Sequence, residues 1–131
     1  MEITFLISSI ILIIVAGFAE AVMDKLQFHY DKSIFLRFAN QRFWNPEISW
    51  VNKWKNGDPI YGEKFIGSST IFVGVTDAWH LFKSIRTLSL FTSLLFVSLY
   101  LSDSIMLLLA FIAMRIIFGL AFTYFFNLLD N

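Results

Sequence analysis

The sequence predicts an all-α, polytopic membrane protein with three membrane-spanning helices, as its composition and its long apolar runs indicate. Its 131 residues are 57% hydrophobic and 15% charged, whereas soluble globular domains average roughly 45–50% and ~25%. The apolar runs are long enough to cross the ~30 Å hydrocarbon core of a bilayer as helices. This balance excludes a disordered chain and an ordinary soluble enzyme.

Net charge and cysteine content exclude further classes of protein. Ten basic and ten acidic residues give a formal net charge of zero, so we expect no nucleic-acid binding driven by net charge. The chain contains no cysteine, which excludes disulfides, thiolate metal sites and thiol redox chemistry. The bilayer is therefore the first partner that the sequence predicts.

The first apolar run, residues 3–22, contains Glu20 as its only charge and predicts the first span. The alternative is a cleaved signal peptide, because Ala19-Glu20-Ala21 has the form of a cleavage site. Glu2 and the absence of a basic residue before the run favour a retained span. Leu26, Tyr30, Ile34 and Phe38 recur at i, i+4, which predicts that the helix continues as an amphipathic stretch to about Phe38.

Residues 24–66 form a polar segment that holds seven of the ten basic residues. Asn45-Pro46-Glu47 predicts the start of a short helix that ends near Lys55. The run 56–59 (NGDP) predicts a turn. Tryptophans with basic neighbours favour a position in the headgroup layer, and a small folded loop with a tryptophan core is the alternative; these tryptophans are Trp44, Trp50 and Trp54.

The rest of the chain predicts two further helices. Residues 67–102 read as one long helix of ~54 Å, partly within lipid. In the alternative, 67–84 is a separate span or an interfacial helix, and a separate span there would make four spans. Ser102-Asp103-Ser104 interrupts the pattern and predicts a cap for the last span, 104–128, which carries Arg115 near its middle.

Charge placement predicts the orientation. With three spans, every basic residue from Lys25 to Arg86 lies on one side of the membrane, and only Glu2 and Asp103 lie on the other. Cytoplasmic flanks carry the excess of Lys and Arg. We therefore expect the N-terminus outside, and the 24–66 segment and the C-terminus in the cytoplasm.

Four ionisable residues near one predicted membrane surface form the candidate site. Glu20 and Asp24 lie at i, i+4 on the first helix, and Asp77 and His80 lie at i, i+3 on the second. If the helices pack side by side, these groups meet as an acid–base site or as ligands of a divalent metal. Nearby cations would hold an anionic headgroup, namely Lys25, Lys83 and Arg86.

Two functional hypotheses follow, with transport behind them. The first is an enzyme that acts on a lipid headgroup or similar amphiphile at the inner surface. The second is a non-catalytic structural or accessory subunit, in a homo-oligomer or with another membrane protein, whose charges are satisfied in pairs. In that case Glu20 pairs with Arg115, and Trp79-His80 is an interfacial anchor. A transport pathway is disfavoured because Arg115 is the only charge deep in a span.

Small and hydroxylated residues within the spans predict helix packing. Gly17 and Ala21 form a small-residue face that permits close approach of another helix, within the chain or between copies. Ser93 and its neighbours Ser89, Thr92 and Ser98 can donate hydrogen bonds across helices or to their own backbone.

Asp24-Lys25 followed by His29 resembles the VanZ-like proteins, a family of lipid-modifying helical membrane proteins. The resemblance covers these few residues and implies chemistry on a lipid headgroup. The stretch from Trp50 to His80 resembles small bacterial or phage membrane proteins, a likeness that implies no activity.

Overall fold

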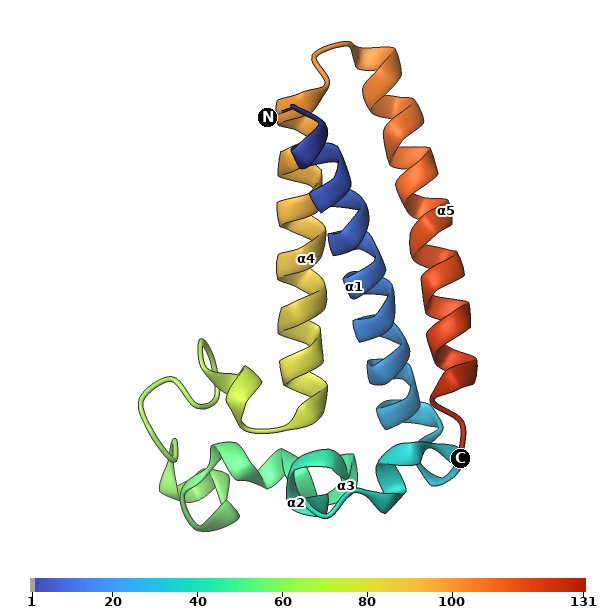
Figure 1. Cartoon of the computed structure of the whole chain (residues 1–131). Helices are drawn as coiled ribbons and strands as arrows, with labels where there is room; N and C mark the ends of the chain where they lie inside the picture. The colour runs from blue at the N-terminus through green and yellow to red at the C-terminus, as the bar shows by residue number, and fades with distance from the viewer. Residues whose placement is uncertain (1) are drawn as a thin grey trace.

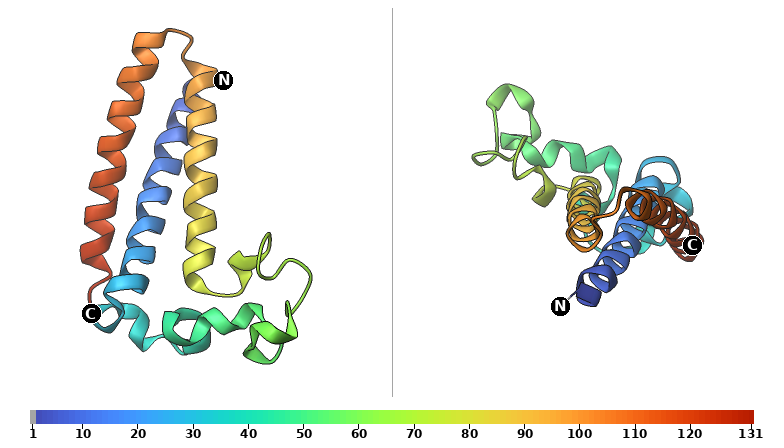
Figure 2. Two further views of the ribbon diagram at one scale, coloured as in Figure 1. Left: turned by 180° about the vertical axis from the view of Figure 1, so that it is seen from behind. Right: turned by 90° about the horizontal axis from the view of Figure 1, so that it is seen from above.

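The computed structural model describes residues 2–131, and three long helices run side by side in it (Figure 1). They are α1 (Glu2–Phe28), α4 (Ala78–Tyr100) and α5 (Ser104–Leu128). α4 and α5 both pack mainly on α1 and touch each other little (Figure 2). In the described part of the chain these three helices alone are long and apolar enough to span a membrane. The all-α class with three candidate spans is thereby confirmed, and the fourth span is not found.

Short helical turns connect α1 to α4 and lie across one end of the three-helix bundle (Figure 1). The C-terminus lies at this end, and the N-terminus and the α4–α5 connection lie at the other. The turns are η1 (Tyr30–Lys32), η2 (Ile34–Arg37), α2 (Gln41–Trp44), α3 (Pro46–Ser49), η3 (Trp50–Lys53), η4 (Lys55–Gly57), η5 (Pro59–Tyr61) and η6 (Val73–Val75).

α1 ends at Phe28, so the prediction that it continues to Phe38 is wrong. A contact with the end of α5 replaces the helix. Ser33 is extended and forms an isolated bridge with Asp130, and the Ile34 amide donates to the Leu129 carbonyl at 3.0 Å. The apolar spacing still has a use, because Tyr30 and Ile34 pack on the core cluster around Leu26.

α4 begins at Ala78, so the prediction of one helix from residue 67 is also wrong. Gly67 has φ +79°, in the left-handed region that a helix does not contain. Asp77 is extended and caps the helix, since its carboxylate accepts a hydrogen bond from the His80 amide. The 11 residues from 67 to 77 instead form turns beside the start of α4.

Several predicted boundaries are confirmed. Asn45 caps α3 by accepting from the Glu47 amide at 2.9 Å, although α3 ends at Ser49 and continues as the 3₁₀ helix η3. Asn56 and Gly57 form the predicted turn with φ of 54° and 76°. Asp103 caps α5, where its carboxylate accepts from two backbone amides.

Small residues set the distances between the spans. A Cβ added at Gly17 would lie 2.8 Å from the Cβ of Ala121, so α1 and α5 are in close contact at this point. Ser93 of α4 donates to the Ser9 carbonyl of α1 at 2.9 Å. The predicted small-residue packing and the hydrogen bond across helices are therefore confirmed within one chain.

Candidate functional site

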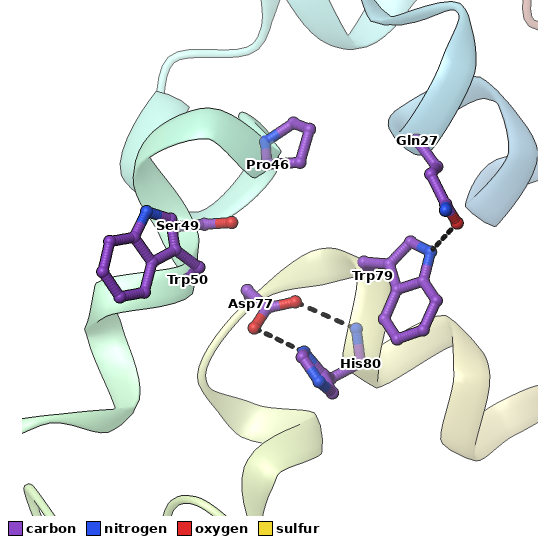
Figure 3. Close-up of a pocket in the computed structure, with 7 residues that line it drawn as sticks. All are labelled: Gln27, Pro46, Ser49, Trp50, Asp77, Trp79 and His80. Atoms are coloured by element: carbon purple, nitrogen blue, oxygen red, sulfur yellow. Dashed lines mark hydrogen bonds and ion pairs between the residues drawn. The ribbon is translucent and has the colours of Figure 1, made fainter. Parts of the chain in front are cut away.

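The first turn of α4 holds a carboxylate and an imidazole in a fixed pair (Figure 3). The His80 ring nitrogen Nδ1 lies 2.7 Å from Oδ2 of Asp77, and the His80 amide donates to Oδ1 at 2.9 Å. The Asp77 carboxylate therefore contacts both the backbone amide and the ring of His80. The Asp77 side chain is 3% exposed and the His80 side chain 24%, so the imidazole is the group that a ligand can reach.

The surroundings of Asp77 favour its ionised form. Burial opposes the charge, but hydrogen bonds from the His80 ring and amide outweigh it, together with the nearby imidazole charge and the Thr76 hydroxyl. The pKa of Asp77 consequently lies below its ordinary value of 3.8. Next to a charged carboxylate, a neutral imidazole favours the tautomer in which Nδ1–H donates to Asp77 and Nε2 is free to accept a proton.

The loop before α4 is tied to the connecting segment, which fixes the pair in place. The Asn52 side-chain amide donates to the Thr76 carbonyl at 2.9 Å and to the Arg42 carbonyl at 2.7 Å. The Thr76 hydroxyl lies 2.7 Å from the Val73 carbonyl and 3.1 Å from Oδ2 of Asp77. Segments 24 residues apart in the sequence therefore lie together beside the Asp77–His80 pair.

A pocket of about 250 Å³ opens beside the Asp77–His80 pair. Its walls come from three elements: the end of α1, the α3–η3 turn and the start of α4 (Figure 3). The Trp79 indole N–H donates to the Gln27 side chain at 3.2 Å, which links α4 to α1 at the rim. The remaining lining is Pro46, Ser49 and Trp50.

His80 also borders a second hollow, of about 420 Å³, that lies along α4. Lys83 and Ser84 supply polar groups there, and its apolar wall includes Ile71 and Leu88. The Lys83 ammonium lies 4.9 Å from the centre of the Trp79 ring, and the Lys83 side chain is exposed. His80 thus lines two hollows, and Lys83, which forms none of the ion pairs of the described side chains, lines the second of them.

The other predicted site residues lie apart from this pair. Glu20 forms an ion pair with Arg86 of α4, and not with Arg115 as the structural alternative expected. Asp24 lies 3.9 Å from His29, which follows α1. Lys25 is buried, pairs with Asp130 and lies 3.6 Å from the centre of the Phe126 ring. Lys25 and Arg86 are therefore already in ion pairs, and of the three predicted cations Lys83 is the one that could bind an anionic group.

The expected convergence of Glu20, Asp24, Asp77 and His80 on a metal does not occur. Among the described side chains, residues 3–131, no group of three or more His, Asp or Glu could hold a metal ion. The physical reason is that these carboxylates already have partners. Glu20 forms an ion pair with Arg86, and Asp77 caps α4 and contacts His80. The site reduces to Asp77, His80 and Lys83.

Sequence reasoning missed the residues that build the pocket around the pair. The Asn45-Pro46 signal predicted the short helix, but nothing in it predicted that Ser49 and Trp50 would face the start of α4. No sequence pattern indicated Gln27 as a pocket residue, because its contact there is a hydrogen bond from the Trp79 indole of another helix. The residues that line this pocket come from separate elements, and tertiary packing brings them together. A local sequence pattern does not predict such packing.

No family model matches the sequence, and no curated protein or solved structure matches it either. The likeness of Asp24, Lys25 and His29 to the VanZ-like proteins therefore stays a prediction.

Proposed function

We propose that this integral membrane protein performs acid–base chemistry on the headgroup of a lipid or similar amphiphile, with His80 as the catalytic residue. The observation that carries the proposal is the Asp77–His80 pair, held at 2.7 Å with the carboxylate buried, the imidazole partly exposed and His80 lining two hollows. A carboxylate that orients a histidine is a common arrangement for a general base.

The chemistry follows from the tautomer that the pair favours. With Nδ1–H donated to Asp77, Nε2 of His80 takes a proton from water or from a substrate hydroxyl, which then attacks the headgroup. Asp77 stabilises the imidazolium that forms and is a positioning residue. As the oxygen of the nucleophile bonds to the phosphorus or ester carbon of the headgroup, the bond from that atom to the leaving-group oxygen breaks, and Nε2 returns the proton to this oxygen.

The second hollow supports a lipid as the substrate. Lys83 is a cation beside the apolar side chains of Ile71 and Leu88, an arrangement suited to a phosphate and the start of an acyl chain. The exposed faces of Ile66 and Ile71, 93% and 83%, favour contact of this loop with the bilayer surface.

The proposed orientation places the site at the inner leaflet. The segment from Lys25 to Arg86 carries nine of the ten basic residues and lies at the C-terminal end of the bundle. The positive-inside rule then assigns this end to the cytoplasm.

A second proposal, an accessory subunit without catalysis, is favoured by the ion pairs Glu20–Arg86 and Lys25–Asp130, which satisfy charges two by two. The hollows beside His80 favour the acid–base site instead, because an interfacial anchor needs no reachable imidazole.

The test compares wild type with His80→Gln in vesicles of phosphatidylglycerol and phosphatidylcholine, with lipids analysed by mass spectrometry. We expect wild type to convert an anionic lipid, and His80→Gln to slow this conversion by roughly 10²-fold or more. His29→Gln is the matched control, since it removes the other histidine, and we expect its rate to equal that of wild type. Unchanged lipids with wild type, or equal rates for His80→Gln, would contradict the proposal.

A further inference from the structure

Arg115 lies midway along α5, where a charge is costly, and has no acidic partner in the described side chains, residues 3–131. At ~1.5 Å per residue it is about 16 Å from Ser104 and about 20 Å from Leu128. Arginines near helix ends extend to the interface, but a residue at mid-span is too far from either end. Its guanidinium carbon lies 5.7 Å from the centre of the Phe118 ring, and its Nη1 lies 3.2 Å from the point that a Cβ at Gly119 would occupy.

Arg115 lines an apolar groove of about 280 Å³ between the spans. The groove exists because α4 and α5 pack on opposite parts of α1 and separate from each other (Figure 2). Ile13 of α1 lies in its lining, and α4 and α5 form the two walls. The wall residues are Leu90, Leu94, Phe111, Met114 and Phe118.

From the unpaired charge and the groove, we infer that this face binds a membrane-spanning helix of a different protein that carries a carboxylate at mid-membrane depth. The Arg115 side chain is exposed on the surface of the chain at mid-membrane depth, where a guanidinium calls for an anion, and the groove is apolar apart from Arg115. A carboxylate on a helix is the one acidic group that reaches this depth, because lipid phosphates lie at the interface. The inference does not depend on the Asp77–His80 site.

A second copy of this chain does not supply the anion. α4 and α5 contain no acidic residue, and the acidic residues of α1 are Glu2, Glu20 and Asp24. Glu20 is paired with Arg86 and lies about 10 Å along α1 from Ile13. Asp24 is still farther toward the polar end, and Glu2 lies about 16 Å from Ile13 toward the other end.

The test uses designed polyleucine helices, labelled for fluorescence energy transfer and mixed with the full-length protein in vesicles. One helix carries a central Glu, a second is all leucine, and a third carries its Glu near one end. We expect the central-Glu helix to bind about three- to tenfold more tightly than the other two. Arg115→Leu should remove this difference, and Arg115→Glu should transfer the preference to a helix with a central Lys.

Three results would overturn the inference. The first is equal binding of the central-Glu and all-leucine helices to wild type. The second is a preference for the central Glu that persists in Arg115→Leu. The third is self-association of wild type that Arg115→Leu abolishes, because the occupant is then a second copy. Circular dichroism in the same vesicles reports the fold of each variant, and Arg115→Gln repeats the comparison with a polar side chain if Arg115→Leu does not fold. His80-dependent lipid conversion is unaffected by any of these results, so the two proposals fail separately.

Discussion

Two carboxylate–histidine pairs lie near the polar end of the bundle, and they differ in how the backbone holds them. Asp77 and His80 meet across the start of α4 at 2.7 Å, whereas Asp24 and His29 meet across the end of α1 at 3.9 Å. Asp77 is 3% exposed and Asp24 33%. The residue types are the same, so the difference comes from the helix end at which each pair lies.

A helix start offers free backbone N–H groups, and a helix end offers free carbonyls. Asp77 can therefore accept from the His80 amide and ring together, which orders both groups. Asp24 lies within the last turns of α1, where the backbone amides are already used, and only its side chain can reach His29. The position of Asp77 as the cap of α4 therefore holds the Asp77–His80 pair in one geometry, whereas the Asp24–His29 pair has no such backbone contact.

The largest expected difference between the pairs is in stability. Asp77→Ala removes the cap of α4 and the acceptor of the His80 ring, and we expect it to lower the free energy of unfolding by about 1–3 kcal/mol. Asp24→Ala removes a long, exposed contact, and we expect a change within ~0.5 kcal/mol. Equilibrium unfolding in detergent micelles measures both. Equal losses for the two variants would show that the cap is not what distinguishes the pairs.

A smaller effect should appear as a pH dependence. Asp77→Asn keeps an oxygen for the cap and removes the charge. Because the pKa of Asp77 is lowered in the folded protein, the stability from its charge is complete above the ordinary value of 3.8 and is lost as pH falls through the lowered pKa. We expect wild type to exceed Asp77→Asn by about 1 kcal/mol at pH 7, and the gap to close in strong acid.

Unfolding measured from pH 7 down to pH 2 tests this sign, with Asp24→Asn as the matched control. A gap between wild type and Asp77→Asn that widens in acid would contradict the assignment of Asp77 as an ionised cap.

The smallest effect should come from the histidine of the loose pair. The His29 ring is 44% exposed and packs edge-on against Phe126 at 5.4 Å. His29→Ala should therefore cost about 0.5 kcal/mol. A loss as large as that of Asp77→Ala in the same unfolding assay would mean that His29 has a structural role that the contacts do not reveal.

The spans were predictable because their signals are local. Long, predominantly apolar runs define α1 and α5, and Asp103 marks the start of α5 within a single turn. The short helix α3 was predictable for the same reason, since Asn45-Pro46 carries its own cap. The end of α1 was not, because Ser33 and Ile34 bond to residues about a hundred positions later.

The site was predictable in part. The i, i+3 spacing of Asp77 and His80 predicted this pair, because residues three positions apart at a helix start lie close together. The predicted group of Glu20 and Asp24 with Asp77 and His80 does not form, because Glu20 pairs with Arg86. Among the predicted headgroup-binding cations, Lys25 pairs with Asp130. Partner choice between helices depends on their rotation and depth, and an apolar helix pattern leaves both open.

The Glu20–Arg86 pair has a consequence for biosynthesis. Its members are 66 positions apart, and a ribosome that adds ~5–20 residues per second needs about 3 to 13 seconds between them. For that interval α1 is made and α4 is not, so the Glu20 carboxyl lacks its counter-ion. The nascent α1 therefore carries this carboxyl without its partner until the cation of α4 leaves the ribosome, and the contact between α1 and α4 forms only after that.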